Sequence, residues 1–325
     1  MSLGEFDLID RFFKRPVRQA VLGVGDDCAL LQPAPGTQMA ISCDMLIEGQ
    51  HFFADVDPAK LGHKALAVNL SDLAACGAKP LAFTLALALP HADEAWLAAF
   101  ARGLFALADA HNCELIGGDT TRGPLNICIT VFGEVPVVDG RSQALLRSGA
   151  RPGDDLYASG TLGDARLALL ALQGQLDVPG EALQVARVRL EQPTPRVALG
   201  LALRGIASAA IDLSDGLLGD LGHVLTASGC GATVDTAAAA GLLRGDLARH
   251  LGAEQRLSLV LAGGDDYELL FTAPESARAA VQGASQMADT PVARIGRIDA
   301  GTGLRLIDAE GRPVSGHFAS FDHFA

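Results

Sequence analysis

The chain has 325 residues, with 38 acidic and 25 basic side chains, so its formal net charge is −13. Single cores rarely grow beyond about 250–300 residues, so this length predicts two domains. Hydrophobic residues make up 49% and charged residues 19%, a balance typical of a globular chain and not of a disordered one. The negative excess disfavours binding to nucleic acid or to an anionic membrane, because such a surface repels phosphate.

Lysine and cysteine usage narrow the class further. The four lysines all lie at or before position 79, so lysine cannot carry phosphate binding in most of the chain. The six cysteines form no CxxC pair, which argues against a zinc site or a disulfide framework and favours a reducing, cytoplasmic compartment. The N-terminal residues do not have the pattern of a signal peptide. The longest apolar run, Leu81–Leu89, is too short to span a bilayer as a helix, which needs about 20 residues.

The first half of the chain predicts an alternation of helices and strands. Residues 3–14 have the apolar spacing of an amphipathic helix. Pro58 and Gly77 mark the two ends of a second helix. The remaining predicted elements are a short strand over 39–44, a buried strand over 81–89, a helix over 93–111, and strands over 114–117 and 125–138.

The second half repeats this alternation after a segment rich in Gly, Arg, Ser and Pro at 139–154. We place the domain boundary in that segment, which gives domains over 1–138 and 150–325. Alternating strands and helices in both halves predict an α/β fold in α+β layers. An apolar strand leading into Gly-Gly-Asp at 117–119 and again at 263–265 is a faint hint of internal duplication. The predicted elements are strands over 155–159, 209–213, 267–272 and 292–297 and helices over 164–173 and 217–227.

Aspartates gather in glycine-bearing turns instead of spreading along helix faces. Asp and Gly are ordinary turn residues, and Ser214 or Asp215 could simply cap the helix that follows. Asp72 differs, since it lies inside the apolar helical stretch Ala65–Ala75, where a carboxylate is costly unless it is paired or coordinates a metal. We expect some of these acids to share a task. The six segments are Gly25–Asp27, Ser42–Asp44, Asn69–Asp72, Gly117–Asp119, Asp212–Gly216 and Gly263–Asp266.

The acidic turns indicate a hard divalent cation. Carboxylates gathered at one place repel each other, and a cation offsets that repulsion. Oxygen ligands suit Mg²⁺ or Ca²⁺ better than zinc or copper. No segment fits an EF-hand loop or a Walker A motif, and Gly23-Val24-Gly25 runs into two aspartates that would repel a pyrophosphate without a metal. The pattern therefore predicts Mg-dependent nucleotide chemistry outside the P-loop class.

At these motifs the sequence resembles the thiamine-monophosphate kinases, within the aminoimidazole-ribonucleotide-synthetase-like superfamily. A single GGD is a weak signal, but the ordered set covers nearly the whole chain and is highly specific. The HF pair after the acid-bearing strand separates this family from its relatives. The motifs are GEFDLI (4–9), VGDDCA (24–29), SCDMLIEGQHF (42–52), NLSDLAACGAKP (69–80), IGGDTTRG (116–123), SGTLGD (159–164), DLSDGL (212–217), GGDDYELLF (263–271) and FDHF (321–324).

The resemblance implies a two-domain fold, with an N-terminal mixed sheet used for dimerisation and a C-terminal α/β domain. It implies transfer of the γ-phosphoryl of ATP to thiamine monophosphate, with several Mg²⁺ ions, by a homodimer. The implied metal positions are Asp27, Ser42, Cys43, Asp44, Asp72, Asp119, Asp212 and Asp215. The implied nucleotide positions are Gly118, Asp119, Arg147 and Ser214, and those for the thiamine moiety are His51, Asp265 and Phe321.

Alternatives stay open at several of these positions. His51 could be a surface-turn histidine, and Phe321 could be a C-terminal anchor packed on the core. Relatives often carry Glu where this chain has Asp265, and a tyrosine that often packs near the nucleotide is replaced around Ala101. The alternative function is an ATP-dependent aminoimidazole ribonucleotide synthetase-like ligase. A non-catalytic protein that binds divalent ions or nucleotides is the alternative from another class.

Overall fold

The computed structural model describes residues 4–316 and residue 318, and the chain divides into two compact units. The first unit is the part of the chain up to Leu73 together with Ala78–Gln143. The second is Ala74–Gly77 together with the chain from Ala144 onward. No helix in the described residues is both long enough and apolar enough to cross a membrane. Phe321 lies outside the described residues.

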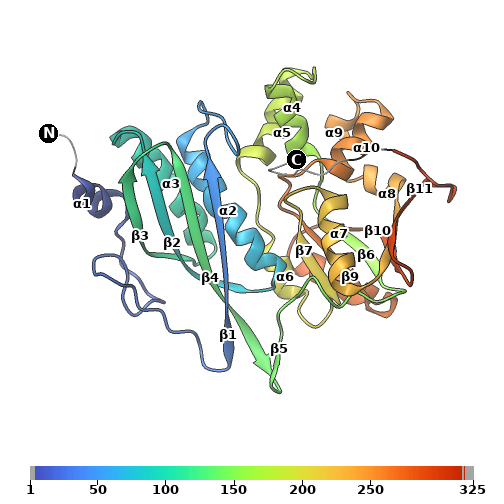
Figure 1. Cartoon of the computed structure of the whole chain (residues 1–325), viewed down its shortest axis with the longest axis horizontal. Coiled ribbons are helices and arrows are strands. Elements are labelled where there is room, and N and C mark those ends of the chain that lie inside the picture. The colour runs from blue at the N-terminus through green and yellow to red at the C-terminus, as the bar shows by residue number, and fades with distance from the viewer. Residues whose placement is uncertain (1–3, 317, 319–325) are drawn as a thin grey trace. The chain divides into compact units, whose positions relative to one another are not determined.

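The first unit is built on one mixed sheet, which Figure 1 shows in blue to green. Its strand order is β1-β4-β2-β3, and the short β5 pairs with β4. The central strand β2 is antiparallel to β4 and parallel to β3. The strands are β1 (Thr37–Ile47), β2 (Lys79–Leu89), β3 (Glu114–Arg122), β4 (Asn126–Val138) and β5 (Arg141–Ser142).

Helices α2 (Pro58–Ala75) and α3 (Glu94–Ala110) lie along one face of this sheet (Figure 1). Asp93 caps α3, because its carboxylate accepts the backbone N–H groups of Ala95 and Trp96. The two helices approach closely at glycines, and a Cβ on Gly103 would overlap the backbone of Ala59. The shorter helix α1 (Glu5–Leu8) continues into a π-helical turn, η1 (Ile9–Phe13).

Strand alternation divides the sheet of the first unit into a covered and an open face. On β2, Leu85 and Leu87 are buried while the intervening Ala86 is exposed. On β1, Ile41, Met45 and Ile47 are 62%, 49% and 39% exposed, so an apolar strip lies on the open face. The buried leucines of β2 belong to the core of the unit, and the exposed apolar side chains come from β1.

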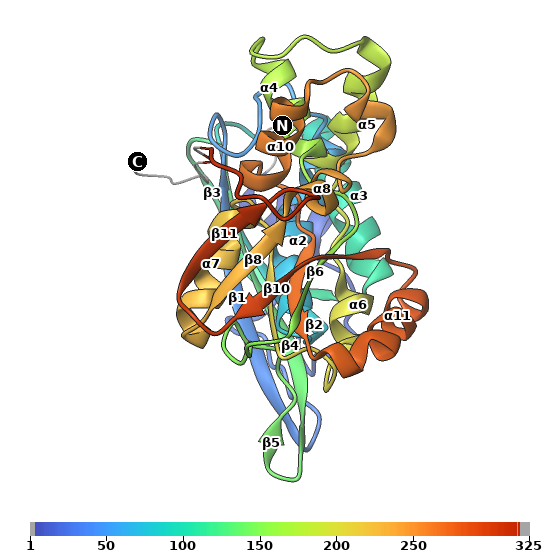
Figure 2. The same cartoon turned by 90° about the vertical axis from the view of Figure 1, so that its right-hand side faces the viewer.

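The second unit holds a six-stranded sheet in the order β11-β8-β10-β6-β9-β7, and Figure 2 shows β11, β8, β10 and β6 side by side. Every pairing is antiparallel except that of β11 with β8. The strands are β6 (Asp155–Ser159), β7 (Ala209–Asp212), β8 (Gly231–Asp235), β9 (Leu269–Ala273), β10 (Val292–Asp299) and β11 (Gly303–Ile307).

The helices of the second unit connect these strands. Proline marks one gap between them, since α5 ends before Pro193 and α6 begins after Pro195. The helices are α4 (Asp164–Leu172), α5 (Gly180–Glu191), α6 (Val197–Ala202), α7 (Leu217–Ser228), α8 (Thr236–Ala240), α9 (Gly245–Ala248), α10 (Ala253–Ala262), the 3₁₀ turn η2 (Glu275–Ala277) and α11 (Arg278–Met287).

Most predicted elements of both halves are confirmed. Two differences concern the motifs, and a third concerns two strands that were not predicted. Strand β3 runs through Gly117–Asp119 to Arg122, so Asp119 lies within a strand and not in a turn after it. The segment before Gly263 is the helix α10 and not a strand, so the prediction that a strand leads into the second Gly-Gly-Asp is wrong. Strands β8 and β11 were not predicted, because five residues that include small and polar types carry too little pattern to be recognised.

Candidate functional site

Ser42 and Asp72 are the first predicted metal positions that the fold brings together. Ser42 lies on β1 and its hydroxyl donates a hydrogen bond to the carboxylate of Asp72 on α2. Asp72 is therefore partnered and half-buried, which resolves how a carboxylate is tolerated within an apolar helix. One turn earlier on α2, Asn69 accepts the backbone N–H of Asp44 through its side-chain oxygen at 3.0 Å. Helix α2 thus binds the acid-bearing part of β1 at two points.

Cys43 points the other way from Ser42 and Asp44. It lies on the open face of the sheet, where its Sγ is 3.4 Å from Sγ of Cys128 on β4. Its thiol is thus directed away from α2, so a contribution of Cys43 to a cation beside Asp72 would have to come from its backbone.

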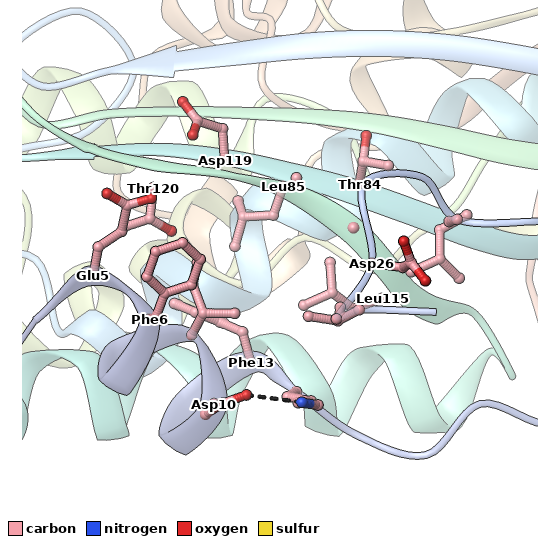
Figure 3. A pocket seen from close by; sticks show the side chains of 18 of the residues that line it. Glu5, Phe6, Asp10, Phe13, Asp26, Thr84, Leu85, Leu115, Asp119 and Thr120 are labelled. Carbon is pink, nitrogen blue, oxygen red and sulfur yellow. Dashed lines mark ion pairs between the residues drawn. The ribbon is translucent and has the colours of Figure 1, made fainter. Parts of the chain in front are cut away.

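A cavity of about 730 Å³ in the first unit contains Asp27 and Asp119 in its lining. Its walls come from α1 and η1, the turn Gly25–Asp27, and the adjacent strands β2 and β3 (Figure 3). Asp119 is exposed, as is the turn that carries Asp27. Besides these carboxylates the cavity has an apolar wall that includes Phe6 and Phe13, and the ion pair of Lys14 with Asp10 at 3.0 Å lies on the same side. The cavity can therefore accommodate a ligand that has one apolar part and one part that carries a cation.

Gly118 has a structural reason to be glycine before any ligand is considered. Its φ is +146°, and a Cβ there would overlap the backbone carbonyl of Leu85 on the neighbouring strand. The close approach of β2 and β3 therefore requires glycine immediately before Asp119.

The predicted metal positions of the first unit form two groups. Asp27 and Asp119 lie at β3, while Ser42, Asp44 and Asp72 lie at β1 and α2. Strands β1 and β3 occupy opposite edges of the sheet, three strand spacings or about 14 Å apart. Over residues 4–316 and 318, no group of three or more His, Cys, Asp or Glu side chains is placed to hold a metal ion. The predicted side-chain donors at these positions are oxygen atoms, apart from the Cys43 thiol, and oxygen suits Mg²⁺ because this ion takes few carboxylates and keeps several waters.

In the second unit, the turn that follows β7 carries three predicted positions. Asp212 is buried at the end of β7, whereas Ser214 and Asp215 are half-buried in the turn before α7. The turn is held by Asp220 of α7, whose Oδ2 accepts the backbone N–H of Asp215 at 3.1 Å and of Gly216 at 3.2 Å. Burial raises the pKa of Asp220 to about 7, although these backbone donors oppose the shift.

Asp265 lies on the loop Gly263–Glu268, which is attached to that turn. Its backbone N–H donates to the carbonyl of Ser214 at 2.8 Å. Two further backbone hydrogen bonds of 2.8 Å join the loop to Leu213. The N–H of Tyr267 donates to the carbonyl of Leu213, and the N–H of Leu213 donates to the carbonyl of Glu268. The positions predicted for nucleotide, metal and thiamine moiety in this unit therefore lie on two segments that are hydrogen-bonded to each other.

Two other predicted positions lie outside these clusters. His51 is half-buried in the turn after β1, and its Nδ1 accepts the backbone N–H of Ile47 at 3.0 Å. This is the turn contact that the alternative interpretation of His51 expected, and it does not test a substrate role. Arg147 is exposed, and its backbone carbonyl accepts a hydrogen bond from Ser228 Oγ at 3.2 Å. Ala101, the position at which the resemblance implies a replaced tyrosine, is buried in α3.

Sequence reasoning missed the buried acids that support these loops. Asp266 is fully enclosed, accepts the N–H of Gly163, and has its pKa raised well above the usual value by burial. Asp164 is also buried, and its carboxylate accepts a hydrogen bond from the hydroxyl group of Thr161 at 2.7 Å. Both belong to quoted motifs, so the signal was present, but only the tertiary structure shows that these acids face inward.

The comparisons with known proteins agree with the order of motifs. The family description "AIR synthase related protein, N-terminal domain" matches residues 25–135, and the corresponding C-terminal description matches residues 151–309. The thiamine-monophosphate kinase of Salmonella typhimurium is 49% identical over 332 residues, which is 100% of this chain and 99% of that protein. The chain belongs to the thiamine-monophosphate kinase family. The enzyme of Escherichia coli K12 is 47% identical over 331 residues, again 100% of this chain and 99% of that protein.

Solved structures of this family share the fold. The crystal structure of thiamine-monophosphate kinase from Stenotrophomonas maltophilia is 47% identical with a TM-score of 0.84, and the match covers 97% of this chain and 99% of that one. A structure of AaThiL complexed with AMPPCP and TMP is 28% identical with a TM-score of 0.76 over 99% and 97% of the two chains. Hydrogenase maturation protein HypE, at 21% identity and a TM-score of 0.75, resembles this chain in fold alone.

Proposed function

We propose that this chain transfers the γ-phosphoryl group of ATP to thiamine monophosphate, producing thiamine diphosphate and ADP. The observation that carries the proposal is the 49% identity to a thiamine-monophosphate kinase along the full length of both chains. The AaThiL structure complexed with AMPPCP and TMP supports the choice of the two substrates. The same comparisons disfavour an aminoimidazole ribonucleotide synthetase-like ligase, because the curated relatives at high identity are kinases.

The chemistry of the acceptor explains why no general base is assigned. The second pKa of a phosphate monoester is about 6, so its oxygen is largely ionised at neutral pH and needs no base to activate it. The difficulty is electrostatic, since two anionic phosphates must approach in line. Positioning and charge compensation are then most of what the protein supplies. We therefore propose direct transfer without a phosphorylated enzyme intermediate.

We propose that the cation is Mg²⁺ and that the predicted oxygen donors hold several such ions. When bound, Mg²⁺ neutralises charge on the phosphate oxygens during transfer. The carboxylates and the hydroxyl at the predicted positions are oxygen donors, which Mg²⁺ prefers, and this ion completes its shell with water. The proposed holders are Asp27, Ser42, Cys43 through its backbone, Asp44, Asp72, Asp119, Asp212 and Asp215.

The remaining predicted positions are proposed to bind the substrates. Gly118, Asp119, Arg147 and Ser214 would contact the nucleotide, where Arg147 supplies an exposed positive charge and Gly118 supplies bare backbone. His51, Asp265 and Phe321 would hold the thiamine moiety. The thiazolium ring of that moiety is cationic, so an acid and an aromatic ring suit it.

We further propose a cytoplasmic homodimer. The support for a dimer is the apolar strip of Ile41, Met45 and Ile47 on the open face of the first unit, where a second copy of the chain would cover it. The cytoplasmic location stays a prediction from cysteine usage.

The test of the function is ADP release that depends on thiamine monophosphate. Purified protein with ATP and Mg²⁺ should release ADP when thiamine monophosphate is added and should form thiamine diphosphate in equal amount. The acceptor of the alternative ligase serves as the comparison substrate. Release of ADP only with that acceptor would reject the kinase assignment, and binding of ATP without turnover would favour the non-catalytic alternative.

Asp72→Ala provides the matched test of the metal assignment in the same assay. Its turnover should be nearly abolished, since loss of a metal ligand removes a large electrostatic contribution. Ser42→Ala removes a neutral hydroxyl from the same proposed set and leaves its negative charge unchanged, so its turnover should fall less than that of Asp72→Ala. Activity of Asp72→Ala within about tenfold of wild type would remove Asp72 from the metal-binding set.

A further inference from the structure

Glu268 is a fully buried carboxylate surrounded by three side-chain donors. Arg196 binds it with both ends of its guanidinium, Nε to Oε2 at 2.6 Å and Nη2 to Oε1 at 2.5 Å. Arg189 Nη2 donates to Oε1 at 2.8 Å, and Ser159 Oγ donates to Oε2 at 2.5 Å. A carboxylate with no exposed surface is retained only when its charge is compensated in this way.

The glycine-rich segment SGTLGD (159–164) is shaped around this carboxylate. Gly160 has φ +55°, and a Cβ there would overlap the carboxylate of Glu268. Ser159 also accepts the backbone N–H of Leu269 at 2.9 Å, and the N–H of Gly163 donates to Asp266 at 3.0 Å. The segment that follows β6 therefore encloses the base of the Gly263–Glu268 loop from Asp266 to Leu269.

The loop that Glu268 anchors has a backbone conformation that needs support. Asp265 and Tyr267 have φ values of +60° and +50°, a region that non-glycine residues adopt at a cost. Arg189 stabilises this conformation directly, because its Nη2 donates to the carbonyl of Asp266 at 2.9 Å as well as to Glu268. A single guanidinium group therefore joins the buried carboxylate to the backbone next to Asp265.

We propose that Glu268, together with Arg189, is a positioning residue that sets the loop conformation so that Asp265 can hold the cationic part of the acceptor. This inference rests on the proposed function and goes beyond it, since the proposed function assigns neither Glu268 nor Arg189 a contact with the acceptor. Removing the buried charge relaxes the two left-handed positions of the loop and displaces the carboxylate of Asp265. A displacement of about 1 Å is enough to weaken a positioned contact strongly.

Asp155 is a matched control for Glu268. It begins strand β6, and Ser159, which donates to Glu268, ends the same strand. Asp155 too is a buried carboxylate with two arginine partners and a hydroxyl partner, as Glu268 is. Arg278 Nε lies 2.6 Å from its Oδ2, and Arg294 Nη1 lies 3.2 Å from its Oδ1. Neither arginine has a described hydrogen bond to the Gly263–Glu268 loop. Asp155→Asn therefore removes an equivalent buried charge without touching the loop.

The experiment measures the two KM values of Glu268→Gln and Asp155→Asn beside the wild type, with melting temperatures as a record of stability. Glu268→Gln should raise the KM for thiamine monophosphate by about tenfold or more and change the KM for ATP by less than about threefold. Asp155→Asn should lower stability but leave both KM values within about twofold of wild type. A role in stability alone predicts that both variants lose stability and that neither changes the ratio of the two KM values.

Arg189→Lys keeps the test decisive if Glu268→Gln fails to fold. Lysine retains the positive charge but cannot reproduce the planar fork of donors, so the tie to the Asp266 carbonyl is weakened. It should raise the KM for thiamine monophosphate selectively, whereas Arg294→Lys at the control site should not. If Glu268→Gln or Arg189→Lys leaves the KM values for thiamine monophosphate and ATP unchanged, or raises both equally, the positioning role is overturned. The kinase function is then still intact. Absence of turnover in the wild type overturns the proposed function and this inference together.

Discussion

The pKa of a buried carboxylate in this chain depends on how many hydrogen-bond donors and arginine charges surround it. Asp155 illustrates this, because hydrogen bonds from Arg278 and then from Arg294 hold its pKa below the usual value in spite of burial. Asp266 shows the opposite balance, since its single backbone donor cannot offset complete burial and its pKa is raised. The residue type alone does not distinguish these two cases, because the partners come from distant parts of the chain.

The lowered pKa of Asp155 predicts a specific pH dependence of stability. An acid whose pKa is lower in the folded than in the unfolded state, where it is about 3.9, contributes stability above that value and loses it as pH falls through the folded pKa. Asp155→Asn should therefore lower the free energy of unfolding at pH 7 by about 1–3 kcal/mol. The difference from wild type should shrink as pH falls below about 4. Urea unfolding at pH 7 and at acid pH measures it.

Asp246→Asn is the control for that measurement. Asp246 forms an exposed pair with Arg244 at 2.9 Å, so solvent screens the interaction. This variant should have nearly the stability of wild type at every pH. A difference between wild type and Asp155→Asn that stays constant into acid would contradict a contribution from the ionised Asp155 carboxylate.

At the scale of elements, helix packing in the first unit depends on missing side chains. A Cβ on Gly62 of α2 would overlap the carbonyl of Phe100 on α3, and one on Gly103 of α3 would overlap the carbonyl of Ala59 on α2. The two helices therefore approach at a distance that only glycine permits at these positions. Sequence patterns predicted both helices correctly, but a mid-helix glycine gives no indication from the sequence of which neighbour it faces.

Gly103→Ala should destabilise the protein even though alanine is the better helix former. Propensity alone would stabilise the helix by about 1 kcal/mol, whereas overpacking against a fixed backbone costs about 1–3 kcal/mol. Overpacking should win, because the neighbouring atom is a backbone carbonyl that cannot rotate away. Gly283→Ala in α11 is the control, since nothing lies within 4 Å of its added Cβ, and it should raise the melting temperature. A stabilised Gly103→Ala would contradict the close contact of α2 with α3.

At the scale of the whole molecule, the sheet of the first unit presents an open apolar strip. Ile41, Met45 and Ile47 alternate with Ser42, Asp44 and Leu46, so β1 directs apolar side chains outward and the candidate site residues inward. The leucines of the central strand β2 lie in the core of the unit. A partner copy would therefore meet β1 side chains in place of these leucines.

Ile41→Glu should convert the proposed homodimer into a monomer. Ile41 is 62% exposed, and a charge at the centre of an apolar interface leaves a buried, unpaired carboxylate. Val188 on α5 of the second unit is 49% exposed, so Val188→Glu introduces the same charge elsewhere and should leave the mass unchanged. Light scattering after size exclusion at micromolar concentration gives the mass of each variant. A wild type that is monomeric, or an Ile41→Glu variant that stays dimeric, would contradict the proposed interface.

The amino-acid sequence by itself determined the fold class, most helices and strands, the acidic glycine turns and the family. These depend on local periodicity, turn chemistry and motif order, all of which can be read along the chain. Only the tertiary structure decided that Asp72 pairs with Ser42, that Cys43 faces away from it, and that Glu268 lies between Arg189 and Arg196. Those outcomes depend on strand order and helix packing, which join residues up to 85 positions apart. Local propensity carries no information over that separation, so the partners of the acids became visible only in the folded chain.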